Sequence, residues 1–249
     1  MNRHRHMRIL SVFMVAMVAL ILSAAAPEAW AKKNGKKEMP FSQAKIIIEF
    51  NSSGPDVGVQ VSLDGEPWER VNIEAPDGRK ILDIRSSGSL RKQGLTELFF
   101  ESSEPTLDEL SIAEFLARFP KGKYEFEGKT IDGIELEGTA TLSHAVPAAP
   151  SDLSVQMIGS DLVISWGAVT GPAAGFPNKP IVIVAYQVVV DGGNPSRRFD
   201  VKVPAGTTQV TVPPEFLEPG TEYTFEVLAI DKGGNQTITE GEPFTFLLP

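Results

Sequence analysis

Short apolar runs separated by turn dipeptides constrain the fold of this chain more than any other feature of its sequence. Runs rich in Val, Ile, Phe and Thr recur at intervals of about ten residues, a spacing typical of short strands. Asp-Gly pairs, which tight hairpin turns favour, stand between many of these runs, at Asp64-Gly65, Asp77-Gly78, Asp132-Gly133 and Asp191-Gly192. The pattern predicts an all-β chain of the sandwich or barrel type rather than a parallel sheet with crossover helices.

Residues 1–31 have the features of a secretory signal peptide. Three arginines precede Ile9–Ala26, a stretch without charge, and Ala29-Trp30-Ala31 supplies small residues at both positions that cleavage requires. We therefore expect cleavage after Ala31, which would make the chain a secreted or periplasmic bacterial protein without a stable membrane span. Retention of the apolar stretch as an anchor stays an alternative, because its 18 residues reach the lower limit for a membrane-spanning helix.

Cleavage also narrows the chemistry open to the chain. The remaining 218 residues contain no Cys, and His144 is their single histidine, since His4 and His6 lie in the signal peptide. Disulfides, thiolate catalysis, Cys-ligated metals and triads with a histidine base are therefore not expected, and we predict no cofactor. The formal net charge moves from −9 to −11, which argues against nucleic acid as a partner.

The mature chain divides into a short tail and two β-rich halves. Residues 32–40 begin with four lysines in six positions and predict a flexible basic tail, with contact to anionic lipid or wall polymer as the sharper alternative. The Pro- and Ala-rich stretch Ala145–Pro150 predicts a semi-rigid linker. The predicted domains are therefore 41–146 and 147–249.

The C-terminal half contains seven short apolar runs in about 100 residues, the number of strands in an immunoglobulin-like sandwich. Within the second run, Leu162, Ile164 and Trp166 are spaced two residues apart and therefore share one face of a strand. The runs cover 153–157, 162–166, 181–190, 198–203, 209–212, 217–229 and 237–247.

This half resembles a fibronectin type III domain. The residues that carry the resemblance are Pro150, Leu153, Val155, Trp166, Tyr186, the segment Leu217-x-Pro219-Gly220-Thr221-x-Tyr223, Val227-x-Ala229 and Asn235. The resemblance implies core positions for Trp166 and Tyr186, and a tyrosine corner at Tyr223, whose hydroxyl would bond to the preceding backbone. The chain departs from the family at Gly167–Pro180, a longer Gly- and Pro-rich loop, and it has no Arg-Gly-Asp tripeptide.

The N-terminal half predicts a second β-sandwich that includes one helix. Apolar residues fall at helical spacing over 106–119, where Thr106-x-x-Glu109 and Ser111-x-x-Glu114 are two candidate capping boxes and Pro120 ends the pattern. The segment from Phe119 to Tyr124 resembles a turn that precedes a strand in secreted immunoglobulin-like modules. The predicted strands are 46–50, 57–63, 68–73, 81–85, 95–100, 123–128 and 134–143.

Acidic residues and the single histidine are the candidates for chemistry. A pair of carboxylates could support glycoside hydrolysis, but the favoured interpretation is a solvated sheet face and a helix amino terminus. The two groups are Glu125, Glu127, Glu135 and Glu137, and Glu101, Glu104, Asp108 and Glu109. The loop acids Asp56, Asp64, Asp77 and Asp231 lack the spacing of a calcium loop, so we predict no metal site. For His144 we expect a surface or domain-interface position.

Two aromatic residues are the candidates for a contact surface. Trp68 lies beside a predicted turn and Phe176 lies within the long loop, where exposed rings could stack on sugars. The sequence predicts a non-enzymatic binding, adhesion or spacer protein of the cell envelope, whose partner is an envelope protein or a polysaccharide. Polysaccharide binding through these two rings is the alternative, and a carboxylate-based hydrolase ranks third.

Overall fold

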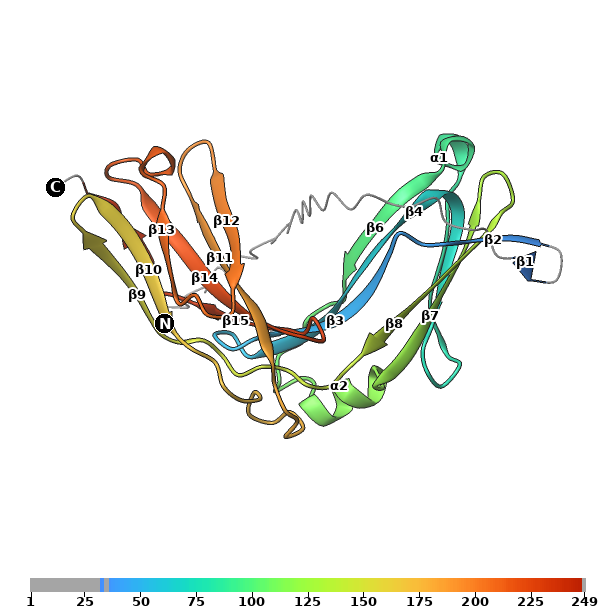
Figure 1. Cartoon of the computed structure of the whole chain (residues 1–249), viewed down its shortest axis with the longest axis horizontal. Coiled ribbons are helices and arrows are strands. Elements are labelled where there is room, and N and C mark those ends of the chain that lie inside the picture. Colours follow the sequence, from blue (N-terminus) through green and yellow to red (C-terminus); the bar gives the residue numbers. More distant parts are fainter. Residues whose placement is uncertain (1–31, 34–35, 248–249) are drawn as a thin grey trace, which may run out of the picture. The chain divides into compact units, whose positions relative to one another are not determined.

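A computed structural model describes residues 32–33 and 36–247, so the predicted signal peptide lies outside the described residues. The described chain is built from strands with two short α-helices (Figure 1). The strands of the N-terminal half are β1 Lys32–Lys33, β2 Lys36–Pro40, β3 Gln43–Asn51, β4 Asp56–Glu74, β5 Lys80–Arg85, β6 Leu95–Glu101, β7 Gly122–Thr130 and β8 Glu135–Leu142. Those of the C-terminal half are β9 Ser151–Ile158, β10 Asp161–Gly167, β11 Ile183–Gly192, β12 Arg197–Pro204, β13 Gln209–Val212, β14 Glu222–Asp231, β15 Gln236–Glu240 and β16 Phe244–Thr245.

The C-terminal half is a β-sandwich. Its first layer has the strand order β13-β10-β9, and its second has the order β15-β14-β11-β12, with β16 also paired to β14. Alternate residues of β10, β11 and β14 point between the layers and form one core. The fold class expected from the apolar runs is therefore confirmed for this half, as is its resemblance to a fibronectin type III domain.

The three aromatic residues that the resemblance placed in the core are buried there. Trp166 and Tyr186 pack with ring centroids 5.4 Å apart, and the Tyr186 hydroxyl accepts a hydrogen bond from the Val169 amide at 2.7 Å. The Tyr223 hydroxyl accepts one from the Glu218 amide at 2.7 Å. This last bond fastens the loop before β14 to the core, which is the role of a tyrosine corner.

The N-terminal half is a sandwich made by one sheet that folds over at β4. The first part of β4 pairs with β3 and β6, while its second part pairs with β5 and β7. The register shifts between Asp64 and Arg70 mark the change of partners, as expected where a strand bends from one layer into the other. The sequence predicted two strands here, 57–63 and 68–73, and the structure joins them.

Phe41 explains why Asp64-Gly65 lies within a strand rather than at the predicted turn. Its buried ring packs against Gly65, Gly128 and Gly138, which belong to three different strands. A Cβ atom at Gly65 or Gly128 would come within 2.8 Å of this ring. Gly65 therefore makes room for an aromatic side chain, and the turn prediction is wrong at this position.

The predicted helix is present but shorter than its apolar pattern. It is α2 Ile112–Arg118, and Ser111 and Glu114 form its capping box: the Glu114 amide donates to Ser111 Oγ at 3.3 Å, and the Ser111 amide donates to the Glu114 carboxylate at 3.1 Å. Residues 106–110 form a separate turn before it. A second helix, α1 Gly88–Gln93, and the 3-10 helix η1 Pro214–Phe216 were not expected from the sequence.

The two segments that the sequence assigned to a tail and to a linker are bound to the fold. Residues 36–40, assigned to a flexible tail, form β2, which pairs in parallel with β8. In the predicted linker, Val146 is fully buried, and Ala148 donates to the Gly171 carbonyl while Ala173 donates to the Val146 carbonyl. The long Gly- and Pro-rich loop thus holds the linker. Within the described part of the chain, no helix has the length and apolar character to span a membrane.

Candidate functional site

The two halves are joined by a strand pairing that crosses from one to the other. β15 runs parallel to β3, with Gln236 opposite Glu49 and Thr237 opposite Phe50, so that one sheet continues through both halves (Figure 1). We use the name seam for this pairing together with the turn before β15, residues 231–235, and the linker, residues 145–150. The seam is the place where residues far apart in the sequence meet, and the site is built around it.

Asn235 is the central residue of the seam. Its side chain is fully buried. Its Oδ1 accepts a hydrogen bond from the Ile48 amide at 2.9 Å, and its Nδ2 donates to the Ser143 carbonyl, Ser143 Oγ and the Ala145 carbonyl at 2.9–3.0 Å. One amide thus satisfies groups on β3 and on the linker. Since a buried polar group without a partner costs about 1–3 kcal/mol, this network holds the halves in one arrangement.

Residues of both paired strands, β15 and β3, make further contacts at the seam. Thr237, also fully buried, donates its hydroxyl to the Pro147 carbonyl at 2.6 Å. Lys45 of β3 lies against Gly234 in the turn, and burial, with a smaller contribution from the charge of Lys202, lowers the pKa of its ammonium group.

A cluster of three carboxylates borders the seam. Glu49 is buried on β3, and oxygen atoms of Glu49, Glu101 and Glu104 lie within 4.8 Å of one another. We call these three residues the carboxylate cluster. Gln236 of β15 donates its side-chain amide to Glu49, and Gln60 donates to Glu101 at 3.0 Å.

The carboxylate cluster has room for its third member because β4 carries a glycine at this point. A Cβ atom on Gly58 would lie 2.8 Å from Cγ of Glu104. The Glu104 side chain therefore lies over β4, in the space that a side chain at position 58 would occupy.

Burial and mutual repulsion change the protonation of the carboxylate cluster. Burial, reinforced by the charges of Glu101 and Glu104, raises the pKa of Glu49 to about 8, although the Gln236 hydrogen bond opposes this. Burial and the charges of Glu101 and Asp56 raise the pKa of Glu104 to about 8. Like charges held this close favour protonation of some of them. The carboxylate cluster therefore takes up protons near neutral pH.

The carboxylate cluster is the group of metal-ligating side chains that the described residues bring together. Carboxylate oxygens are the ligands that Ca²⁺ takes, and a cation would have to displace the protons that these groups hold near neutral pH. At neutral pH the carboxylate cluster is therefore better suited to holding protons than to holding a metal ion. The sequence pointed to Glu101 and Glu104, but it placed them with Asp108 and Glu109 at a helix start, and not with Glu49.

Trp68 and Phe176 do not form the predicted contact surface. Trp68 is fully buried and Phe176 is 7% exposed, and both belong to the core of the N-terminal half. Phe176 packs edge-on against Phe50 with ring centroids 5.4 Å apart. The long loop thus folds back and inserts its aromatic ring into the other half. Aromatic rings bury large apolar areas, and this gain explains why both rings are inside and why their assignment as exposed residues is wrong.

The remaining candidates are distributed over several parts of the fold, although Glu127 and Glu137 are cross-strand partners on β7 and β8. Glu125, Glu127 and Glu137 are exposed on β7 and β8, as expected for a solvated sheet face. Asp231 accepts hydrogen bonds from the Gly233 and Asn235 amides and so shapes the turn before β15. His144 follows β8, and its Nε2 lies 2.8 Å from the Phe119 carbonyl.

Sequence reasoning missed the seam because its partners are distant along the chain. Ile48 and Asn235 are separated by 187 residues. Asn235 was part of the fibronectin type III pattern, but the pattern did not say what its amide binds. One signal was present for Glu49: it is a charged residue in the middle of an otherwise apolar run from Ile46 to Phe50.

No family model matches the chain. Among solved structures, the chain is similar to the FN1–FN3 domains of chicken CNTN1, with 13% identity, a TM-score of 0.39 and coverage of 85% of this chain and 64% of that one. It is also similar to a segment of two fibronectin type III domains from chicken tenascin, with 13% identity, a TM-score of 0.32 and coverage of 83% and 99%.

A third similar structure is the spore cortex lytic enzyme SleM of Clostridium perfringens. It has 20% identity and a TM-score of 0.30, and the match covers 40% of this chain and 28% of the enzyme. All three TM-scores are low, so the fold assignment rests on the strand order and the cores described above.

Proposed function

We propose that this chain is a non-enzymatic binding and spacer module of the bacterial cell envelope, in which two β-sandwiches are held in a fixed relation. The observation that carries the proposal is the Asn235 network, in which one buried amide makes four hydrogen bonds to the other half and the linker. A spacer or adhesion module has to transmit position and force between its ends. A continuous sheet with a satisfied polar seam provides that rigidity.

The envelope location is supported by the sequence. Residues 1–31 carry a positively charged start, an apolar stretch and a small-x-small site. If the proposal holds, the N-terminal residue of the protein recovered from the periplasmic or secreted fraction of a bacterial host is Lys32. Recovery of the uncleaved chain in the membrane fraction would instead support an anchored protein.

Polysaccharide binding through Trp68 and Phe176 has lost its support, because both rings lie in a core. A polysaccharide remains a partner class for other surfaces of the module. The fibronectin type III-like fold of the C-terminal half is compatible with loop-mediated or strand-edge contacts to an envelope protein.

Rigidity can be tested by distance measurements between spin labels. The chain contains no Cys, so labels attach only where cysteines are introduced, and Thr96→Cys on β6 and Gln156→Cys on β9 are exposed positions in opposite halves. We expect one narrow distance distribution in pulsed electron paramagnetic resonance.

The matched comparison is the same labelled pair with Asn235→Ala, which should broaden the distribution, and with Asn178→Ala, an exposed asparagine of the long loop, which should not. A broad distribution in the chain with native Asn235 would contradict the proposed spacer role.

A further inference from the structure

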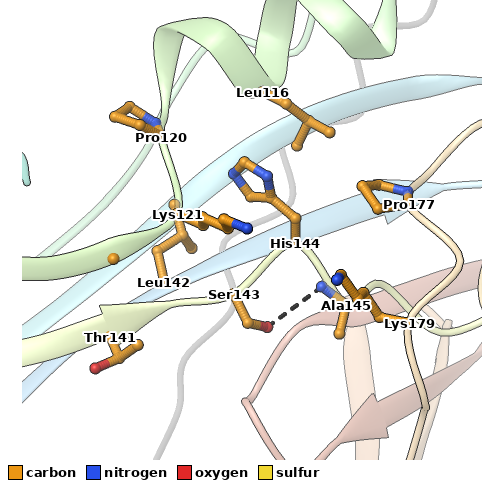
Figure 2. Close-up of a pocket in the computed structure, with 11 residues that line it drawn as sticks. Leu116, Pro120, Lys121, Thr141, Leu142, Ser143, His144, Ala145, Pro177 and Lys179 are labelled. Atoms are coloured by element: carbon orange, nitrogen blue, oxygen red, sulfur yellow. Dashed lines mark hydrogen bonds between the residues drawn. The ribbon is translucent and has the colours of Figure 1, made fainter.

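A groove of about 810 Å³ lies where α2, the start of β7, the end of β8 and the long loop meet. In Figure 2 the ring of His144 points toward α2, with Pro120 and Lys121 on one side and Pro177 and Lys179 on the other. Its volume falls in the range of about 300–1,000 Å³ typical of small-molecule sites. Two of its walls, α2 and the long loop, are also the elements that depart most from a plain β-sandwich.

The walls of the groove are aliphatic. Leu116, Pro120, Leu142, Ala145 and Pro177 line it, and no aromatic ring other than the imidazole of His144 does. Stacking on sugar rings uses flat aromatic faces, so the lining does not favour a carbohydrate. It suits an aliphatic chain.

The charge of the groove is opposite to that of the chain. Lys121 and Lys179 lie on opposite walls, and no Asp or Glu lines the groove, although the chain as a whole has a net charge of −9. Both lysines are exposed, and among the described ion pairs neither has an acidic partner. An anionic group at the mouth of the groove would thus meet two unneutralised ammonium groups.

Few hydrogen-bonding groups are available inside the groove. His144 Nε2 already contacts the Phe119 carbonyl, and Ser143 Oγ already accepts a hydrogen bond from Asn235. A peptide would bring backbone amides and carbonyls that need partners. A ligand with an apolar body and one polar head needs far fewer.

We propose that this groove binds a free, monomeric amphiphile that consists of one unbranched aliphatic chain and an anionic head, with the chain against the aliphatic walls and the head between Lys121 and Lys179. This site gives the proposed binding module a ligand class, and to that extent it rests on the proposed function. The ligand proposal and the spacer proposal can fail separately, because the spin-label distances are measured without any ligand.

Isothermal titration calorimetry with the chain from Lys32 onward tests the proposal. The probe is dodecanoate, kept below its micelle concentration, and dodecyltrimethylammonium is the matched cationic probe. We expect one dodecanoate per chain and at least about tenfold weaker binding of the cation, which corresponds to about 1.4 kcal/mol. Equal binding of both probes, or no binding of dodecanoate, would overturn the proposal.

Charge-reversing variants locate the site. Lys121→Glu combined with Lys179→Glu should weaken dodecanoate binding about tenfold or more, while Lys92→Glu combined with Lys129→Glu changes the net charge equally at exposed positions outside the groove and should leave binding unchanged. Equal losses in both pairs would show a general charge effect and reject the groove.

A last experiment measures binding of the same chain to vesicles of anionic phospholipid. Binding to vesicles without binding of the monomer would replace the proposed ligand with a membrane surface.

Discussion

Each half of the molecule contains a buried tyrosine that fastens the loop before its strand, and the comparison of these two corners shows what the halves share. In the C-terminal half, the Tyr223 hydroxyl accepts from the Glu218 amide at 2.7 Å. In the N-terminal half, the Tyr124 hydroxyl donates to the Pro120 carbonyl at 3.0 Å. Both rings are fully buried, and both tyrosines follow a Pro- and Gly-containing turn.

The surroundings of the two corners differ. Tyr223 lies among other aromatic rings, stacked on Phe244 with centroids 5.5 Å apart and close to Phe216. The corner of Tyr124 instead follows α2 directly. Tyr124 shares its core with Phe41, whose ring packs against three glycines. The same local device thus works in a sandwich of two separate layers and in one made by folding over a single sheet.

The largest expected effect comes from removing one core ring in each half. Phe41→Ala and Phe225→Ala should each lower the free energy of unfolding by about 3–5 kcal/mol, because each leaves a cavity. Guanidinium titrations can follow the halves separately, since Trp68 and Trp166 each lie in one core. In the chain from Lys32 onward, which lacks Trp30, the variants Trp68→Phe and Trp166→Phe each keep a single tryptophan and give one signal per half.

If the seam couples the halves, either core variant shifts the transition of both tryptophan signals. A shift confined to the half that carries the substitution would break the comparison and show two independent domains, as the sequence predicted at 41–146 and 147–249.

Asn235→Ala should have the next largest effect, about 3 kcal/mol. It leaves the Ile48 amide and the carbonyls of Ser143 and Ala145 without their partner, and each buried orphan costs about 1–3 kcal/mol. We also expect the two tryptophan transitions to separate. Asn178→Ala, at an exposed position, is the control and should leave the transitions together; coincident transitions in Asn235→Ala would refute the role of this residue.

Acidification should stabilise the protein between pH 8 and pH 5, by about 3 kcal/mol. The pKa of Glu49 is about 8 in the folded protein, above its ordinary value of 4.5, so the folded state binds more protons in this window. Its contribution is complete below pH 4.5 and is lost as the pH rises through 8. Melting temperatures measured in the presence of a chelator should follow this trend.

Glu49→Gln should flatten that dependence and raise stability at pH 8, since a neutral amide removes the repulsion while its carbonyl can still accept from Gln236. Glu97→Gln, an exposed position on β6, should leave the pH dependence unchanged. A pH profile equal to that of the native chain would exclude Glu49 as its source.

The smallest effect separates the two corners themselves. Tyr124→Phe and Tyr223→Phe each delete one hydroxyl, and we expect losses of about 1 kcal/mol, somewhat larger for Tyr223 because its hydroxyl holds a backbone amide. Urea titrations of both variants measure the difference. A loss at Tyr223 and none at Tyr124 would mean that the corner of the N-terminal half is packing alone.

The sequence predicted what depends on local pattern. Alternating runs and a family signature located Trp166, Tyr186 and Tyr223, and a capping box located α2. The pattern could not show that Gly65 serves Phe41, because that contact joins separate strands. It placed Trp68 and Phe176 outside the core because nearby turn residues suggest exposure, while burial depends on what folds over them. Glu49 and Asn235 meet their partners only after both halves have formed.

The pairing of β15 with β3 also protects an edge. In a sandwich that stands alone, the outermost strand of a layer presents a row of free amides and carbonyls, a template for unwanted pairing between copies. Here three residues of β15 find those partners within the same molecule. The C-terminal half produced by itself would expose this edge at Gln236–Ile238, so it should self-associate more readily than the whole chain.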